Sequence, residues 1–221
     1  MFFIATREDK PILFPLPTHG AAAGVSFTTI RDAIGDLPDV SNGGGADAMP
    51  YGAKTASAYA RALREGTDVL SNHRAPRLHP KNIERLTHIP EGGSWRDIPH
   101  SLLPAGMMRA KRSDHTKRYG RPHWNSLSCT VLTKCDVHWG AFFHPEQPRA
   151  ITPREAARLQ SFPDRFAFQG SQTEQFVQVG NAVPPLLARA VAATILTAME
   201  SATDAAPMAR VGVGGNLELA L

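Results

Sequence analysis

Cysteine and histidine side chains stand close together in the middle of the sequence, and both could do chemistry. A cysteine thiolate is a nucleophile, and Lys134 would lower the pKa of the neighbouring Cys135 thiol. Thiolates and imidazoles are also zinc ligands, and four candidates are close in sequence: His123, Cys129, Cys135 and His138. No Cys-x-x-Cys pair occurs among them, and a lone cysteine usually packs as a small apolar residue. We therefore expect no catalytic or metal-binding residue here, and a small zinc-binding domain remains an alternative.

A basic segment with interleaved aromatic residues could bind a polyanion. The formal net charge is +4, and residues 105–150 hold eight basic side chains against three acidic ones. Long cationic side chains neutralise phosphates and release counterions, and loop side chains can reach base edges. A merely solvated surface is the alternative for such a run of charge. The segment predicts contact with double-stranded DNA through Arg109, Lys111, Arg112, Lys117, Arg118, Arg121 and Lys134, among which lie Tyr119, Trp124 and Trp139.

Two blocks near the C-terminus carry a family resemblance. They are Arg149-Ala-Ile-Thr-Pro-Arg-Glu-Ala-Ala-Arg-Leu-Gln-Ser-Phe-Pro163 and Gln178-Val-Gly-Asn-Ala-Val-Pro-Pro-Leu-Leu-Ala188. Together they resemble the last two sequence motifs of DNA cytosine-5 methyltransferases, which move a methyl group from S-adenosylmethionine to carbon 5 of cytosine. Residues 2–7 are similar to the strand that closes the catalytic block of this family, and residues 28–38 to the helix that follows. Residues 119–133 resemble its variable target-recognition region.

The resemblance implies roles for six residues in the two blocks. Gly180, Asn181 and Val183 would lie on a loop that contacts S-adenosylmethionine. The local alternative is a turn before a helix opened by Pro184 and Pro185. Three arginines would organise the recognition region and approach the DNA backbone, or would line a solvated helix face: Arg149, Arg154 and Arg158.

Several features of the family do not occur in these 221 residues. The nucleophile of the family lies in a Pro-Cys-Gln loop, whereas Cys129 sits in Ser-Cys-Thr and Cys135 in Lys-Cys-Asp. The Glu-Asn-Val block and the Phe-x-Gly-x-Gly loop are also missing, and the glycines at 212–215 precede no helix. We therefore expect the C-terminal part of a methyltransferase, inactive without a catalytic half that a separate chain could carry. A non-catalytic DNA-binding module, or the remnant of a truncated gene, is the alternative.

The expected architecture is α/β. It combines part of a Rossmann-like methyltransferase fold, namely a terminal strand and a returning C-terminal helix, with a small mixed target-recognition domain. The expected domains are residues 1–38 as the end of the catalytic domain, 39–170 as the recognition region, 171–200 as the return, and 201–221 as a flexible tail. The apolar run over residues 2–5 predicts a strand buried on both faces.

Local signals place the remaining elements. Capping-box spacing predicts helix starts after Thr29 and after Thr152, the second with Pro153 at the first helical position. Helices are also expected over residues 55–65, 80–86 and 185–199, and short strands over 130–133 and 137–143. The glycine-rich stretch 41–47 is a candidate linker.

Composition predicts a cytoplasmic protein without a membrane role. Two cysteines do not make a disulfide framework, and residues 1–7 lack the pattern of a signal peptide. The longest apolar stretch, residues 182–199, contains Pro184, Pro185 and Arg189. This composition favours a buried helix over a bilayer span.

Overall fold

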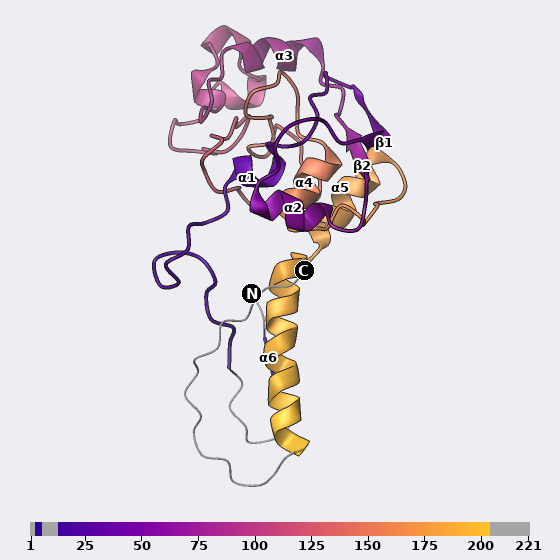
Figure 1. Ribbon diagram of the computed structural model, residues 1–221. Coiled ribbons are helices and arrows are strands. Elements are labelled where there is room, and N and C mark those ends of the chain that lie inside the picture. The colour runs from indigo at the N-terminus through magenta and orange to yellow at the C-terminus, as the bar shows by residue number, and fades with distance from the viewer. Residues whose placement is uncertain (1–2, 6–12, 204–221) are drawn as a thin grey trace. The chain divides into compact units, whose positions relative to one another are not determined.

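The computed structural model describes residues 3–5 and 13–203 of the 221-residue chain. The chain divides into two compact units, Phe27–Ala182 and a second unit made of Met1–Ser26 with Val183–Leu221. All helices and strands labelled in Figure 1 except α6 belong to the Phe27–Ala182 unit. We call this unit the main unit.

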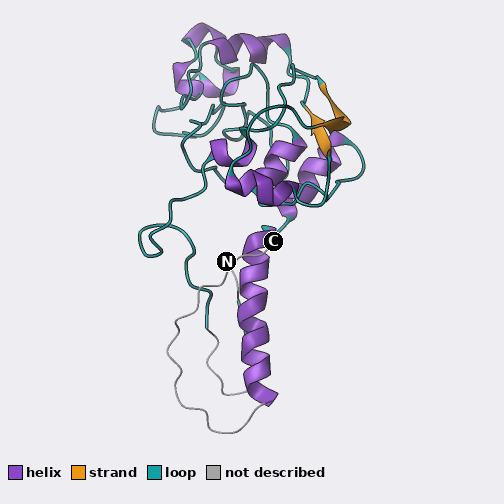
Figure 2. Cartoon of the chain, viewed as in Figure 1, coloured by secondary structure: helices purple, strands orange, loops and turns teal. Residues whose placement is uncertain are grey.

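The main unit combines short helices with one small sheet and long connecting loops (Figure 2). Strand β1 (Gly45–Pro50) pairs antiparallel with β2 (Val69–Arg74). The α-helices are α1 (Ile30–Ile34), α2 (Ala58–Arg64), α3 (Pro80–Thr87), α4 (Pro153–Leu159) and α5 (Gln172–Asn181). Three single 3-10 turns, η1 (Trp95–Asp97), η2 (His100–Leu102) and η3 (Ala105–Met107), follow α3. The observed class is α/β, with a two-stranded sheet in the described residues.

The predicted helix starts are confirmed. Thr29 caps α1, and Asp32 returns the bond to the Thr29 backbone N–H, which completes a capping box. Thr152 and Glu155 do the same for α4. These contacts satisfy backbone N–H groups that have no partner within the helix. Helix α3 begins at residue 80 as expected, whereas α2 begins at Ala58 because the Ser57 hydroxyl caps it.

Other expected elements differ from the structure. The linker predicted over residues 41–47 is wrong in its second half, because Gly45 begins β1 opposite Arg74. Gly45 has φ of 90°, which favours glycine, and an added Cβ would lie 2.1 Å from the carbonyl oxygen of His73. The strands predicted over 130–133 and 137–143 are also wrong. These segments form turns, with one isolated bridge between Phe143 and Ala150.

Helix α5 was not predicted. Its signal is a capping box formed by Ser171 and Glu174. Both α1 and α5 pack against α4, so the compact main unit extends beyond residues 39–170 at both ends. The physical reason is that α4 is buried on all sides and takes its neighbours from both flanking segments.

The second unit contains α6 (Pro185–Thr203). Residues 3–5 form no strand, and Phe3 is 90% exposed, so the expected terminal strand is absent from the described part. On the face of α6 that was expected to be buried, Val191 is buried, Ile195 and Ala198 are partly buried, and Leu187 is exposed. Leu196 and Met199 are also exposed, so α6 is not a fully buried helix in the described residues. The helical stretch Gln172–Met199 contains an 18-residue window with a mean hydropathy of 1.5, which by length and composition alone also suits a membrane span. The expected tail falls largely on residues 204–221, which lie outside the described residues.

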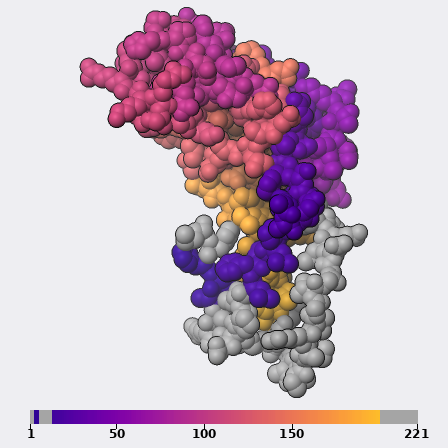
Figure 3. Space-filling view, turned by 90° about the vertical axis from the view of Figure 1, so that its left-hand side faces the viewer, coloured from indigo at the N-terminus to yellow at the C-terminus, as the bar shows by residue number. Residues whose placement is uncertain are grey.

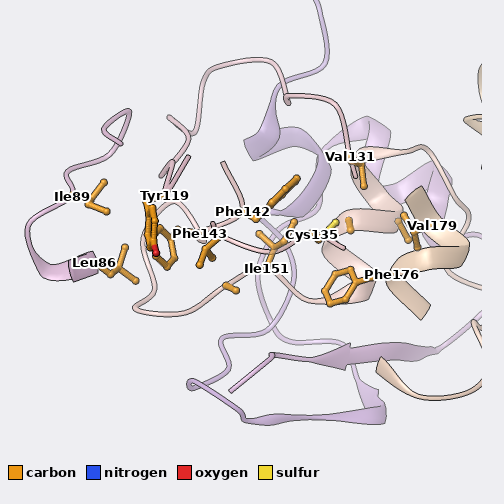
Figure 4. Packing of buried hydrophobic residues seen from close by; sticks show 14 of the residues in the cluster. Leu86, Ile89, Tyr119, Val131, Cys135, Phe142, Phe143, Ile151, Phe176 and Val179 are labelled. Carbon is orange, nitrogen blue, oxygen red and sulfur yellow. The ribbon is translucent and has the colours of Figure 1, made fainter. Parts of the chain in front are cut away.

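The apolar core of the main unit gathers around the loops that follow α3. Figure 4 shows Tyr119, Phe142 and Phe143 packed between Leu86 of α3 and Phe176 of α5. A second cluster joins α1 to β2 and Trp124 through Ile30, Ile34 and Leu70. The loops around residues 100–130 form a continuous part of one face of this unit (pink in Figure 3). Side chains of these loops, such as Met107 and Tyr119, are buried in this core and hold the loops in place.

Candidate nucleic-acid interface

Arg149 lies in a fully buried ion pair. Its guanidinium donates two hydrogen bonds to Glu155, Nη1 to Oε2 at 2.8 Å and Nη2 to Oε1 at 2.7 Å. Glu155 Oε2 also accepts from the backbone N–H of Thr152 at 2.7 Å. Burial disfavours the ionised carboxyl, but Arg149 outweighs it and holds the pKa of Glu155 well below its usual range. The capping box of α4 is thus linked to the start of the first sequence block.

Arg158 lies between two buried carboxylates. It donates to Asp164, Nε to Oδ1 at 2.6 Å and Nη2 to Oδ2 at 2.5 Å. Its Nη1 donates to Asp36 Oδ1 and to the carbonyl oxygen of Ala33, both at 3.0 Å. Tyr51 donates its hydroxyl to Asp164 at 2.6 Å. One guanidinium therefore connects α4 with the end of α1, the loop after α4, and the residue that follows β1.

Arg154 bonds mainly to backbone oxygens. Its Nε donates to the carbonyl of Ser71 in β2 at 2.8 Å, and its Nη2 donates to that of Phe166 at 2.6 Å. Asp164 supplies the nearby countercharge at 3.6 Å. Asn72, which has φ of 60°, makes two hydrogen bonds to the same loop. Its side-chain amide donates to the carbonyl oxygen of Phe168 and accepts from the backbone N–H of Phe168, both at 2.9 Å. These side chains replace the backbone ladders that an irregular segment lacks.

The expectation that these three arginines approach the DNA backbone is therefore wrong, and so is the solvated-face alternative. The side chains of Arg149, Arg154 and Arg158 have no exposed surface. A phosphate cannot reach a guanidinium whose donors are already taken inside the protein. Their observed contacts tie α4 to the end of α1, to β2 and to the loop that follows α4.

Two buried histidines complete the polar core. His73 lies between Thr152 Oγ1 at 3.0 Å and the carbonyl oxygen of Pro38 at 2.9 Å. His144 accepts backbone N–H groups of Glu146 at 3.1 Å and Gln147 at 2.9 Å on Nδ1, as a neutral ring does. Burial lowers the pKa of both, that of His144 to about 4, although Glu155 opposes the shift. Sequence reasoning missed these two residues.

Five of the predicted DNA-contacting side chains are exposed: Arg109, Lys111, Arg112, Lys117 and Lys134. Four of them lie on the turns between η3 and Tyr119. Tyr119 is buried and fixes the end of these turns, because its backbone N–H donates to the carbonyl oxygen of Val137 at 2.7 Å. The structure therefore presents these cations on a surface with an ordered base.

Arg118 and Arg121 behave differently from those five. The Arg118 guanidinium lies over the Trp139 ring at 4.5 Å, in a cation–π contact. Arg121 donates to backbone oxygens of Pro145 at 2.8 Å, of Ile89 at 3.2 Å, and of Glu146. Arg121 is half-buried and its donors hold two loops together, so DNA contact by its remaining exposed surface stays a prediction.

The three predicted cofactor contacts have unlike surroundings. Gly180 lies inside α5, not in a turn, and an added Cβ would be 2.5 Å from the backbone nitrogen of Thr133. Close packing against the 132–133 backbone thus explains this glycine without a ligand. Asn181 ends α5 and is exposed, and Val183 in the second unit is 47% exposed.

Cys135 does not have the environment of a nucleophile. Burial raises the pKa of Cys135 to about 12, which outweighs any effect of Lys134. Its thiol lies 3.1 Å from the carbonyl oxygen of Leu132, as in a packed structural residue. Among the described residues, no three His, Cys, Asp or Glu side chains group as a metal site would require. The zinc-binding alternative therefore has no support.

Comparison with known proteins gives a consistent result over nearly the whole chain. Residues 2–197 match the family model described as C-5 cytosine-specific DNA methylase. The chain is 37% identical to DNA (cytosine-5)-methyltransferase 1A of Oryza sativa subsp. japonica, over 91% of this chain and 15% of that protein. It is 34% identical to the type II methylase M.HgiDII of Herpetosiphon aurantiacus, over 89% of this chain and 53% of that protein.

A solved structure shares the fold. It is a prophage-encoded protein of E. coli, assigned as a DNA modification methyltransferase, with a TM-score of 0.56 and 20% sequence identity. The match covers 80% of this chain and 49% of that one. The chain thus spans about half, or less, of the length of the relatives it matches.

Removing Arg158 should destabilise the main unit severely. In Arg158→Met, Asp36 and Asp164 lose a buried countercharge, so we expect the free energy of unfolding to fall by about 3–5 kcal/mol. Arg165→Met is the control, since Arg165 is exposed and donates only to the carbonyl of Glu65 at 3.3 Å. Urea denaturation followed by circular dichroism measures both. Equal stability of the two variants would contradict the proposed role of the pair.

Acid should destabilise the fold partly through His144. Its pKa is about 4 in the folded chain and about 6.5 in an unfolded one. Only the unfolded state takes up this proton between those values, so stability is complete above pH of about 6.5 and falls toward pH of about 4, by about 3 kcal/mol. His144→Asn keeps an acceptor for the two backbone N–H groups. We expect a shallower slope of unfolding free energy against pH in this variant, and an unchanged slope would refute the assignment.

Proposed function

Because the chain belongs to the C-5 cytosine-specific DNA methylase family, we propose that it provides DNA target recognition in a cytosine-5 methyltransferase. A further part of the proposal is that it completes the S-adenosylmethionine pocket. The observation that carries the proposal is the separation of its cations into two sets. One set is buried and builds the polar core, whereas the other is exposed, four of its five members on turns that end at the buried Tyr119.

The DNA-facing set consists of five exposed cations: Arg109, Lys111, Arg112, Lys117 and Lys134. Phosphate contacts of this kind fix the position of a protein on the duplex without reading sequence. Side chains on the same loops would then reach base edges in a groove. Methyl transfer to cytosine also requires the base to leave the stack, which demands a protein surface pressed against the duplex. Double-stranded DNA is therefore the proposed partner.

In the proposed complete enzyme, S-adenosylmethionine supplies the methyl group. The exposed residues Asn181 and Val183 would line part of its pocket, in keeping with the family resemblance. Gly180 would act indirectly, because its packing against the 132–133 backbone sets the position of the last turn of α5. The proposed return of α6 to a Rossmann-like sheet would cover its exposed apolar residues, such as Leu187 and Leu196.

The chemical step requires a Pro-Cys-Gln loop that these 221 residues do not contain. Cys135 is excluded as a substitute by its burial and its raised pKa. We propose that the nucleophile is supplied by another segment, either on the same polypeptide or on a separate chain. The role of this chain would then be binding and orientation.

DNA binding by the chain should depend on salt through Lys117. We expect Lys117→Ala to reduce the slope of log affinity against log salt concentration by about 1, because one phosphate contact is lost. Fluorescence anisotropy with a labelled duplex at several salt concentrations measures the slope. Lys81→Ala, at an exposed lysine on α3, is the control and should leave it unchanged. Absence of any salt-dependent binding by the wild-type chain would contradict the proposal.

The purified 221-residue chain should not transfer methyl groups by itself. A tritiated S-adenosylmethionine assay on duplex DNA should give counts equal to a blank without protein, since the Pro-Cys-Gln loop that carries the nucleophile of the family does not occur in these 221 residues. The same preparation should still bind duplex in the anisotropy assay, which separates a missing nucleophile from a misfolded protein. Turnover above the blank would overturn this part of the proposal.

A further inference from the structure

One of the three tryptophans is displayed on the surface. Trp95 and Trp124 are 3% and 9% exposed, whereas Trp139 is 57% exposed. A large aromatic side chain left in water forgoes the stabilisation that its burial would give, of the order of a few kcal/mol. The exposed ring therefore leaves a large aromatic face available at the surface.

The turn that carries Trp139 is firmly held. On one side, the backbone N–H of Tyr119 donates to the carbonyl of Val137 at 2.7 Å. On the other, the N–H of Gly120 donates to the carbonyl of Gly140 at 3.3 Å. Val137 is itself buried in the core. The exposed ring thus stands on a backbone that is fixed immediately before and after it.

Two glycines permit this arrangement. An added Cβ at Gly120 would lie 2.5 Å from the Cβ of Ala141, and one at Gly140 would lie 2.4 Å from the buried ring of Phe142. Neither contact is compatible with a side chain, so both backbones approach more closely than other residues allow. The display of Trp139 is therefore built into the packing of the main unit.

Two cationic residues, Arg118 and Lys117, belong to the surroundings of the exposed ring. The Arg118 guanidinium lies over the indole at 4.5 Å, and the carbonyl of Arg118 accepts the backbone N–H of Trp95 at 3.1 Å. Lys117, which directly precedes Arg118 in the chain, is exposed. The indole ring could stack on the face of a nucleobase, and the cations beside it could contact phosphates. Such a surface suits a nucleic acid as its partner.

We propose that Trp139, with Arg118 stacked on it, contacts a nucleobase face of the bound DNA. This inference rests on the proposed function and adds an apolar contact to the phosphate contacts. Base faces are covered by their neighbours in an intact duplex, so the ring stacks where a base step is opened or a base is missing. Trp139 therefore favours duplexes with a disrupted stack.

The test compares two labelled duplexes of identical sequence, one intact and one with a single abasic site, at fixed salt. We expect the full-length chain to prefer the abasic duplex, and Trp139→Ala to lose about tenfold in affinity for it. Trp139→Phe keeps an aromatic face and should retain most of the preference, whereas Trp139→Leu should not. Quenching of the tryptophan emission on binding should disappear in Trp139→Phe, because the other two tryptophans are buried.

The slope of affinity against salt separates this inference from the proposed function. Trp139→Ala should keep the wild-type slope, since no phosphate contact is lost, whereas Lys117→Ala lowers it. If Lys117→Ala lowers the slope but Trp139→Ala binds both duplexes as the wild type does, the stacking contact is refuted and DNA recognition stands. If the wild-type chain binds neither duplex, both proposals fail. Circular dichroism of each variant checks that the turn substitution leaves the fold intact.

Discussion

A single buried guanidinium, that of Arg158, holds the main unit together. It lies between Asp36 and Asp164, and each carboxylate comes from a different segment. A charge inside a protein is tolerated only when its partners are also present, so the three groups must be brought together in one arrangement or not at all. The path of the chain around α4 depends on this requirement. Arg149 with Glu155 imposes the same condition at the other end of the helix.

This constraint explains how a region with little regular structure keeps a defined shape. Sheets and helices satisfy backbone groups by ladders, whereas much of the main unit consists of loops. Here the guanidinium of Arg154 and the amide of Asn72 bind loop carbonyls directly. The loop over residues 163–168 is thus fixed by side chains from the interior.

The cations show why residue type alone does not identify a binding surface. Arg149, Arg154 and Arg158 belong to the blocks that resemble the family most clearly, yet they are buried, and Arg121 binds backbone oxygens. Exposed cations such as Lys117 stand in a less distinctive stretch. An arginine can serve the interior or a phosphate equally well by its chemistry, so only the position of its countercharges decides between the two uses.

The sequence by itself determined the family and the features that depend on near neighbours. The helix starts at Thr29 and Thr152 could be predicted because each capping box closes within four residues. The tertiary structure alone decided the pairing of β1 with β2, the burial of the arginines and the exposure of Trp139. Arg158 and Asp36 are 122 positions apart in the chain, and no local pattern records such a contact. Burial is a property of the packed chain, because it depends on which distant segments arrive on every side.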